Sequence, residues 1–396
     1  MDAEKFRSLV AAGPVLADGA MGTALIARGA PVDACLDEWS LREPAAVEAV
    51  HRASIEAGAR IVWTNTFGAN RFRLERHGLQ GRVAAICAAG VGVARRAGAE
   101  LVAGSLGPLG VRLAPYGRVR PADAADAYRE QAEALASAGV DVLVLETQSD
   151  LREMEQAIGA IRDASPGLAL LVTATFTRDD RTLLGSTPEQ VADALLPLRV
   201  DGIGVNCGEG PAQVLRVARR MRAVAGDAPI VARPNAGGPA EVAGRLVYPA
   251  TPAYVGEVAR ALLGQRVAVL GGCCGTGPEH VAAIGEAIRE AATAPGDAGA
   301  DATARRDAVR VEVAPGVADD DERLPTDAIA PTGLEASLAA PGPTIAVEME
   351  PPRSFNAAAL VAAAATLRDA GADAIDVADS PMAKMRMSAW AACRLV

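Results

Sequence analysis

Aromatic residues are scarce in this chain of 396 residues: they make up 3% of it, whereas apolar residues of all kinds make up 50%. The core must therefore be built from alanine, valine, leucine and isoleucine, which suits the buried strands of a parallel sheet. The chain has no apolar run of the roughly 20 residues that cross a bilayer, so we expect no contact with a membrane. Its first residues lack the basic and apolar regions of a signal peptide, and we expect a cytoplasmic protein.

Basic stripes and histidine-rich segments are also missing. The chain has 39 basic and 49 acidic residues and a net charge of −10, which argues against a nucleic-acid partner and fits ordinary solubility. The three histidines, His51, His77 and His280, do not follow predicted strands, so we expect no histidine ligand to a metal. The six cysteines do not resemble a disulfide framework, and in a reducing compartment clustered cysteines indicate metal binding or catalysis.

The first 290 residues or so repeat one pattern, in which a short apolar run is followed by a small motif and a helical stretch. The apolar runs predict eight strands, at residues 15–17, 61–64, 101–103, 142–145, 168–175, 202–205, 230–232 and 267–270. Segments between them, such as 45–58 and 122–139, have apolar residues at helical spacing and end in glycine. Eight strands alternating with helices predict an α/β fold, a (β/α)8 TIM barrel, and we place this domain at residues 8–292.

The unusual residues follow the strands directly. They include the segments DGAMGT at 18–23, NCG at 206–208 and GGCCG at 271–275. The carboxyl ends of barrel strands share one face, and that face carries the active site of such enzymes. Residues more than 250 positions apart in the sequence are therefore expected to converge.

Cys207 ends the sixth predicted strand, and Cys273 and Cys274 end the eighth. Three thiolates can hold zinc and leave a fourth tetrahedral position open, which is typical of a catalytic site, and a substrate thiol bound there would be activated. Both adjacent cysteines can reach one metal only where the backbone leaves the strand, and the flanking glycines permit this. The alternative is that Cys207 is a small buried residue and the vicinal cysteines are an incidental or redox pair. The other cysteines, Cys35, Cys87 and Cys393, are interpreted as structural.

Together, the segments DGAMGT, GVNC (204–207) and GGCCG resemble the homocysteine S-methyltransferase family over roughly residues 8–292. The resemblance implies one zinc ion per chain, bound by Cys207, Cys273 and Cys274, with the sulfur of L-homocysteine as the fourth ligand and methionine as the product. The methyl donor stays open among S-methylmethionine, S-adenosylmethionine, betaine and a methylcobalamin or methylfolate system.

The other candidate site residues are expected to bind the amino-acid part of the substrate or to orient the site. The resemblance implies that Glu146 binds the ammonium group and that Asp18 contacts the amino acid or orders the site. Backbone N–H groups near Gly19 and the hydroxyl of Thr66 are candidates for the carboxylate. Asn206 and Asn235 are expected to orient the metal site or the substrate. The alternatives are that Asp18 caps a turn, that Glu146 pairs with an arginine, and that Thr66 and Asn235 only support loops.

After about residue 291 the composition changes. We interpret 293–343 as a largely disordered linker with a weak candidate strand at 309–313, and 344–396 as a βαβ segment. The segment VEMEPP (347–352) resembles the first strand of methylenetetrahydrofolate reductase, in which Glu348 matches the catalytic acid. Most of the strands that bind flavin in such a barrel are missing from this segment, so we expect neither reductase activity nor FAD; an ordinary βαβ tail is the alternative. Two other functions stay open, a non-catalytic zinc or thiol-redox module and an inactive remnant of a bifunctional enzyme.

Overall fold

The computed structural model describes residues 1–242, 245–293, 337–341, 344–349 and 357–377, and it describes no side chains for 240–246. The chain divides into two compact units, Met1–Ala298 and Gly299–Val396. Among the described residues, no helix is both long and apolar enough to span a membrane.

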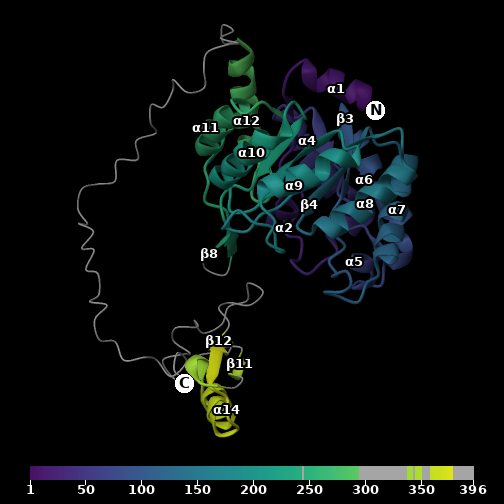
Figure 1. The fold of residues 1–396 in the computed structure, drawn as a ribbon. Coiled ribbons are helices and arrows are strands. Elements are labelled where there is room, and N and C mark those ends of the chain that lie inside the picture. Colours follow the sequence, from purple (N-terminus) through teal and green to yellow (C-terminus); the bar gives the residue numbers. More distant parts are fainter. Residues whose placement is uncertain (243–244, 294–336, 342–343, 350–356, 378–396) are drawn as a thin grey trace, which may run out of the picture. The chain divides into compact units, whose positions relative to one another are not determined.

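The first unit is built around a parallel sheet of eight strands (Figure 1). In chain order these are β1 (Val15–Leu16), β2 (Ile61–Trp63), β3 (Leu101–Leu106), β4 (Val142–Gln148), β5 (Ala169–Ala174), β6 (Gly202–Cys207), β7 (Ile230–Pro234) and β10 (Val267–Leu270). Their order in the sheet is β1-β10-β7-β6-β5-β4-β3-β2. A parallel bridge between Ala17 and Ile61 joins the two edge strands, and Asp18 N donates to Ile61 O at 3.1 Å. The sheet therefore closes, and the predicted (β/α)8 barrel with its eight strands is confirmed.

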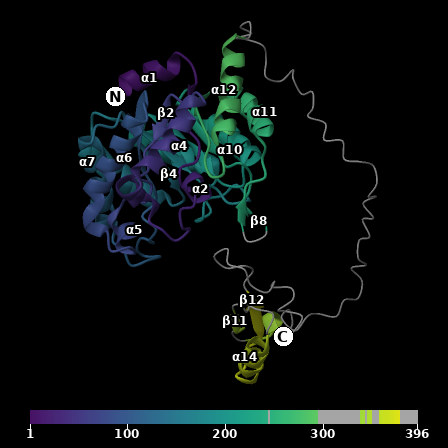
Figure 2. The ribbon, with the colours of Figure 1, turned by 180° about the vertical axis from the view of Figure 1, so that it is seen from behind.

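Helices surround this barrel, as the two opposite views show (Figures 1 and 2). The α-helices are α1 (Ala3–Ala11), α2 (Gly22–Ala27), α3 (Trp39–Arg42), α4 (Pro44–Glu56), α5 (Arg71–Glu75), α6 (Val83–Arg96), α7 (Pro121–Ser137), α8 (Leu151–Ala164), α9 (Pro188–Leu195), α10 (Pro211–Ala225), α11 (Pro252–Leu263) and α12 (Pro278–Thr293). Short 3-10 helices are η1 (Leu36–Glu38), η2 (Gln80–Arg82) and η3 (Leu196–Leu198). A hairpin of β8 (Ala240–Val242) and β9 (Arg245–Val247) follows β7.

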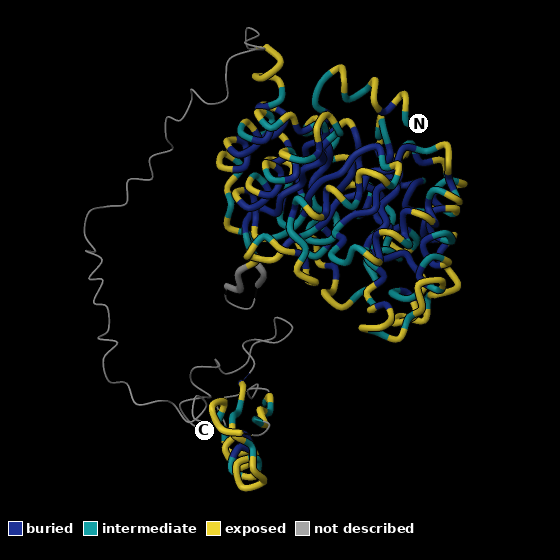
Figure 3. Tube along the Cα trace, in the orientation of Figure 1, coloured by how far each residue is buried: buried dark blue, intermediate teal, exposed yellow. Residues whose placement is uncertain are grey.

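Side chains alternate between two cores along each strand. In β4, Val142 and Val144 pack inside the barrel, whereas Leu143 and Leu145 pack outward against the helices. The strands are accordingly buried on both faces (Figure 3), which is why they read as unbroken apolar runs. Phe6 of α1 joins the inner core, so this helix covers the amino-terminal end of the barrel and leaves the carboxyl end for the site.

The described part of the second unit consists of a short helical stretch at 337–339 and one βαβ motif. It contains β11 (Ala346–Met349), α14 (Ala358–Asp369) and β12 (Ala374–Val377), with β11 and β12 parallel. The predicted strands and helix of this segment are confirmed. The candidate strand at 309–313, most of the predicted linker and the segment 378–396, including Cys393, lie outside the described residues.

Candidate active site

The strand order places the three candidate zinc ligands around β7. β6 and β10 both pair with β7, so Cys207 at the end of β6 and Cys273 after β10 approach each other across it. Cys207 pairs in register with Pro234, whose carbonyl also accepts from Cys273 N at 2.8 Å. Residues far apart in the sequence therefore share one strand end.

The sulfur atoms of Cys207, Cys273 and Cys274 all lie within 4.8 Å of one another. Zinc–sulfur bonds of about 2.3 Å in a tetrahedron require sulfur atoms about 3.8 Å apart, so this donor set fits one zinc ion with a fourth position for another ligand. The chain turns sharply here: Cys207 and Gly208 have φ values of 67° and 75°. A left-handed cysteine is uncommon, and such conformations gather at functional sites.

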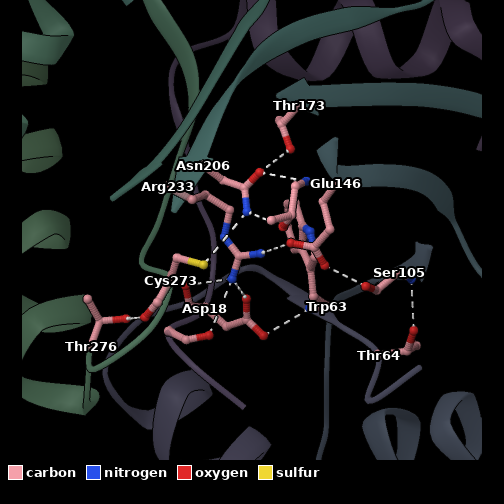
Figure 4. Close-up of polar contacts among 12 residues, drawn as sticks. Asp18, Trp63, Thr64, Ser105, Glu146, Thr173, Asn206, Arg233, Cys273 and Thr276 are labelled. Atoms are coloured by element: carbon pink, nitrogen blue, oxygen red, sulfur yellow. Dashed lines mark hydrogen bonds and ion pairs between the residues drawn. The ribbon is translucent and has the colours of Figure 1, made fainter. Parts of the chain in front are cut away.

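Two asparagine amides support the cysteines. Asn206 Nδ2 lies 3.7 Å from Cys273 Sγ, and Asn235 Nδ2 lies 3.6 Å from Cys207 Sγ. Asn206 Oδ1 accepts from Thr147 N at 2.8 Å and from Thr173 Oγ1 at 2.7 Å, which fixes the amide in place (Figure 4). Donors aimed at sulfur stabilise thiolate charge and orient the ligands of a metal site.

The thiols share their protons unequally. Hydrogen bonds from Cys273 and Cys274 lower the pKa of Cys207 far below its usual value. The same bonds to Cys207 raise the pKa of Cys273 and of Cys274. The cluster therefore gives up its first proton readily, which favours binding of a cation.

The cysteines open into a cavity of about 490 Å³ at the barrel mouth. Its base is lined by Asp18, Trp63, Ser105, Glu146 and Arg233. Its outer part is lined by loop residues that include Met21, Ile26, Cys35, Leu36, Asp37, Phe67, Arg73, Arg76 and His77. The volume is within the usual range for a small-molecule site.

A buried ion cluster forms the base of the cavity (Figure 4). Arg233 Nη2 lies 2.6 Å from Asp18 Oδ1, and Arg233 Nη1 lies 3.7 Å from Glu146 Oε2. Burial raises the pKa of both carboxyl groups to about 7, although the guanidinium opposes this. Ser105 Oγ donates to Glu146 Oε1.

Comparison with known proteins identifies the family. The family model described as homocysteine S-methyltransferase matches residues 15–288, which covers every strand of the barrel. The chain belongs to the homocysteine S-methyltransferase family.

Individual relatives agree with this assignment. The chain is 32% identical over 293 residues to the methionine synthases of Mycobacterium tuberculosis and Mycobacterium leprae. These alignments cover 69% of this chain but 24% of each synthase, so the chain spans about a quarter of the length of these relatives. Two crystal structures of the Escherichia coli homocysteine methyltransferase MmuM share the fold. The metallated form has a TM-score of 0.60 at 24% identity and the oxidized form 0.59 at 25%; each match covers 98% of the MmuM chain and 70% or 71% of this one.

Most residues predicted for this methyltransferase site converge in the structure. Asp18, Gly19 and Glu146 line the cavity with the cysteines, and Asn206 and Asn235 stand behind the sulfur atoms. Glu146 also has the arginine neighbour that was its alternative, Arg233, and Asp18 accepts hydrogen bonds from Arg233 Nη2 and from Trp63 N.

Thr66 is not among the residues that line the cavity. Its side chain is fully buried behind the cavity wall, where its hydroxyl bonds to Thr64 Oγ1 at 2.6 Å and to Ser105 O at 2.8 Å. These contacts match the loop-supporting alternative.

Sequence reasoning missed several residues of the site. Arg233 and Trp63 belong to predicted strands or their ends, and a charged residue at the end of an otherwise apolar strand was the available signal for Arg233. The ring of Tyr248 packs where a Cβ on Gly275 would stand, and burial together with the neighbouring Cys274 raises the pKa of its hydroxyl. Cys35, interpreted as structural, lines the outer cavity.

Proposed function

We propose that this protein transfers a methyl group to the sulfur of L-homocysteine and forms methionine, with one zinc ion bound by Cys207, Cys273 and Cys274. The observation that carries the proposal is the approach of three thiols within 4.8 Å of one another at the mouth of a barrel of this family. A redox or purely structural role of these cysteines is not favoured by the family assignment.

The chemistry is a displacement at carbon. Zinc, when bound, supplies a Lewis acid that keeps a thiol deprotonated at neutral pH. The substrate sulfur forms a bond to the methyl carbon while the bond from that carbon to the donor breaks, and the electron pair leaves with the donor. Asn206 and Asn235 hold the cysteines, and the cavity base holds the amino-acid end, so the chain supplies orientation.

The outer part of the cavity is the place for the donor. Apolar side chains such as Met21, Ile26 and Phe67 line this part and suit a methyl-bearing molecule. Arg73 also lines it and lies over the Phe67 ring, with 5.0 Å from Arg73 Cζ to the ring centre. S-Methylmethionine, S-adenosylmethionine, betaine and methylcobalamin are the donors to test.

The test is formation of methionine, measured by mass spectrometry, with homocysteine and each of these four donors in turn. We expect methionine with at least one donor, and at least a hundredfold slower formation in Cys274→Ala. Cys87→Ala is the matched control, because Cys87 is a fully buried core residue of α6 and should keep its activity. No methionine with any donor from a zinc-loaded protein would contradict the proposal.

A further inference from the structure

Residues 273–277 form the turn between β10 and α12 that carries two of the three clustered cysteines, here called the cysteine turn. Cys273 O accepts from Thr276 N at 3.1 Å and from Thr276 Oγ1 at 2.6 Å (Figure 4). Cys274 O accepts from Ala236 N at 2.9 Å, and Ala236 lies just beyond the end of β7. The backbone therefore ties the cysteine turn to the end of the neighbouring strand.

His280 lies next to this turn as the third residue of α12, and it is 7% exposed. Its Nδ1 accepts at 3.1 Å from the N–H of Gly277, which directly precedes the helix. A side chain at the third helical position that bonds this N–H is one half of a capping box, a role usually filled by glutamate or glutamine. Histidine has a second ring nitrogen, and Nε2 lies 3.0 Å from Ala250 O. His280 therefore does more than cap its helix.

The two partners of His280 fix the position of its proton. A carbonyl oxygen can only accept, so Nε2 carries the hydrogen, and Nδ1 keeps its lone pair for the Gly277 amide. Glu279 Oε1 also lies 3.3 Å from Nδ1, but the Glu279 side chain is 60% exposed and open to solvent. A proton on Nδ1 would leave the Gly277 N–H without its acceptor. The contacts thus select the neutral tautomer with hydrogen on Nε2.

Ala250 carries this contact on to the cysteines. Its N–H donates to Ala236 O at 2.8 Å, and Ala236 N in turn donates to Cys274 O. These bonds form a closed ring that runs from the cysteine turn through Gly277 to His280, then to Ala250 and Ala236, and back to Cys274. The other members contribute backbone groups, so His280 is the member that a substitution can remove. Ala236 and Ala250 also flank the β8–β9 hairpin, so the ring closes the base of that hairpin.

We propose that His280 is a positioning residue for the metal site, which locks the cysteine turn to the end of β7 by joining α12 to Ala250. This rests on the proposed function, since it assumes that the cluster binds zinc. A turn that is held from two sides has less conformational freedom to lose when a metal binds, so the bridge strengthens zinc binding. Groups behind the ligands of a metal site act in this way by orienting the ligands.

Two substitutions separate the bridge from the helix cap. His280→Gln keeps both an acceptor and a donor, whereas His280→Glu keeps an acceptor for Gly277 N but has no donor for Ala250 O. Zinc affinity is measured by chelator competition on the full chain, so neither homocysteine nor a methyl donor is needed. We expect about tenfold weaker zinc binding in His280→Glu and a change within about threefold in His280→Gln. The negative charge of glutamate favours a cation, so the charge alone cannot produce this loss.

Ile284→Val is the matched control on the same helix, because Ile284 is buried in α12 and takes no part in the ring. It should lose stability but bind zinc within about twofold of wild type. A second readout is nitrogen NMR of the zinc-loaded wild type, which has only three histidines. The ring whose signal His280→Gln removes should carry a proton on Nε2 and none on Nδ1. If His280→Glu does not fold, this tautomer and the zinc affinity of His280→Gln still test the assignment.

Zinc binding as tight in His280→Glu as in wild type would overturn the assignment while leaving the proposed function standing. So would His280→Gln that binds zinc as weakly as His280→Glu, a proton on Nδ1 at neutral pH, or an equal loss of zinc affinity in Ile284→Val. If freshly reduced wild type took up no zinc, the proposed function would fail first and this inference with it.

Discussion

His51 is a buried side chain that makes the stability of the barrel depend on pH. It lies in α4, is 1% exposed, and neither ring nitrogen has a hydrogen-bond partner among the described residues. Burial lowers its pKa from 6.5 to about 4. Between pH 6.5 and pH 4, His51 is therefore protonated in the unfolded chain but neutral in the folded chain. Its contribution to the free energy of unfolding is complete above pH 6.5 and is lost as the pH falls towards 4.

The variant His51→Leu should remove this dependence. Between pH 8 and pH 5 the free energy of unfolding of the wild type should fall by about 2 kcal/mol more than that of the variant. Urea unfolding of both proteins at the two pH values measures the difference. An identical pH effect in both would mean that His51 is not held neutral in the fold.

Some residues of the site can be predicted from the sequence and others cannot. The cysteines could be found because thiolate chemistry restricts the residue type and the strand ends fix their place. Arg233 could not, because its role depends on three partners from other strands, Asp18, Trp63 and Glu146, whose side-chain directions no spacing specifies. Thr66 follows a predicted strand, but its hydroxyl points to Ser105 and not to the cavity.

The turn at the end of β6 is the element on which the metal site depends most. Gly208 has φ 75°, and a Cβ there would overlap the Gln213 amide, which is itself held by Glu209 N. Gly208→Ala should therefore shift the turn, cost roughly 1–2 kcal/mol from the left-handed backbone alone, and weaken zinc at least tenfold. A chelator competition titration measures the zinc affinity.

Gly98→Ala is the matched control for this turn. Gly98 also has a positive φ, 92°, but a Cβ there meets nothing within 4 Å. The control should lose similar stability and keep its zinc. If both variants bound zinc as tightly as the wild type, the conformation of this turn would not be what positions Cys207 for the metal.

At the scale of elements, all eight strands could be predicted because each is buried on both faces and reads as an apolar run. Their ends could not, since strands such as β4 continue through the polar residues of the site, to Gln148. Helix α1 was missed, although Asp2 caps it and Phe6 anchors it, because it precedes the first strand of the repeating pattern. The β8–β9 hairpin was missed because it interrupts a βα unit that otherwise reads as strand, loop and helix.

At the scale of the whole molecule, the barrel unit contains the complete cavity. All residues that line it lie within Met1–Ala298, and the second unit has its own small core around Leu360 and Val377. A protein that ends at Ala298 should therefore fold, since the barrel buries its own core. Its zinc content and its rate of methionine formation should stay within about twofold of those of the full chain. Loss of zinc and of folding on that cut would show that the second unit is needed. The resemblance of residues 344–396 to a reductase stays a prediction.

The most direct measurement is the metal content and the zinc X-ray absorption spectrum of the full chain, with and without homocysteine, in wild type and Cys273→Ala. We predict about one zinc per chain, bound by the three cysteine sulfurs and gaining a fourth sulfur when homocysteine is added, with the zinc lost from the variant. Freshly reduced wild type that takes up no zinc, or zinc that gains no sulfur from homocysteine, would contradict the proposed mechanism.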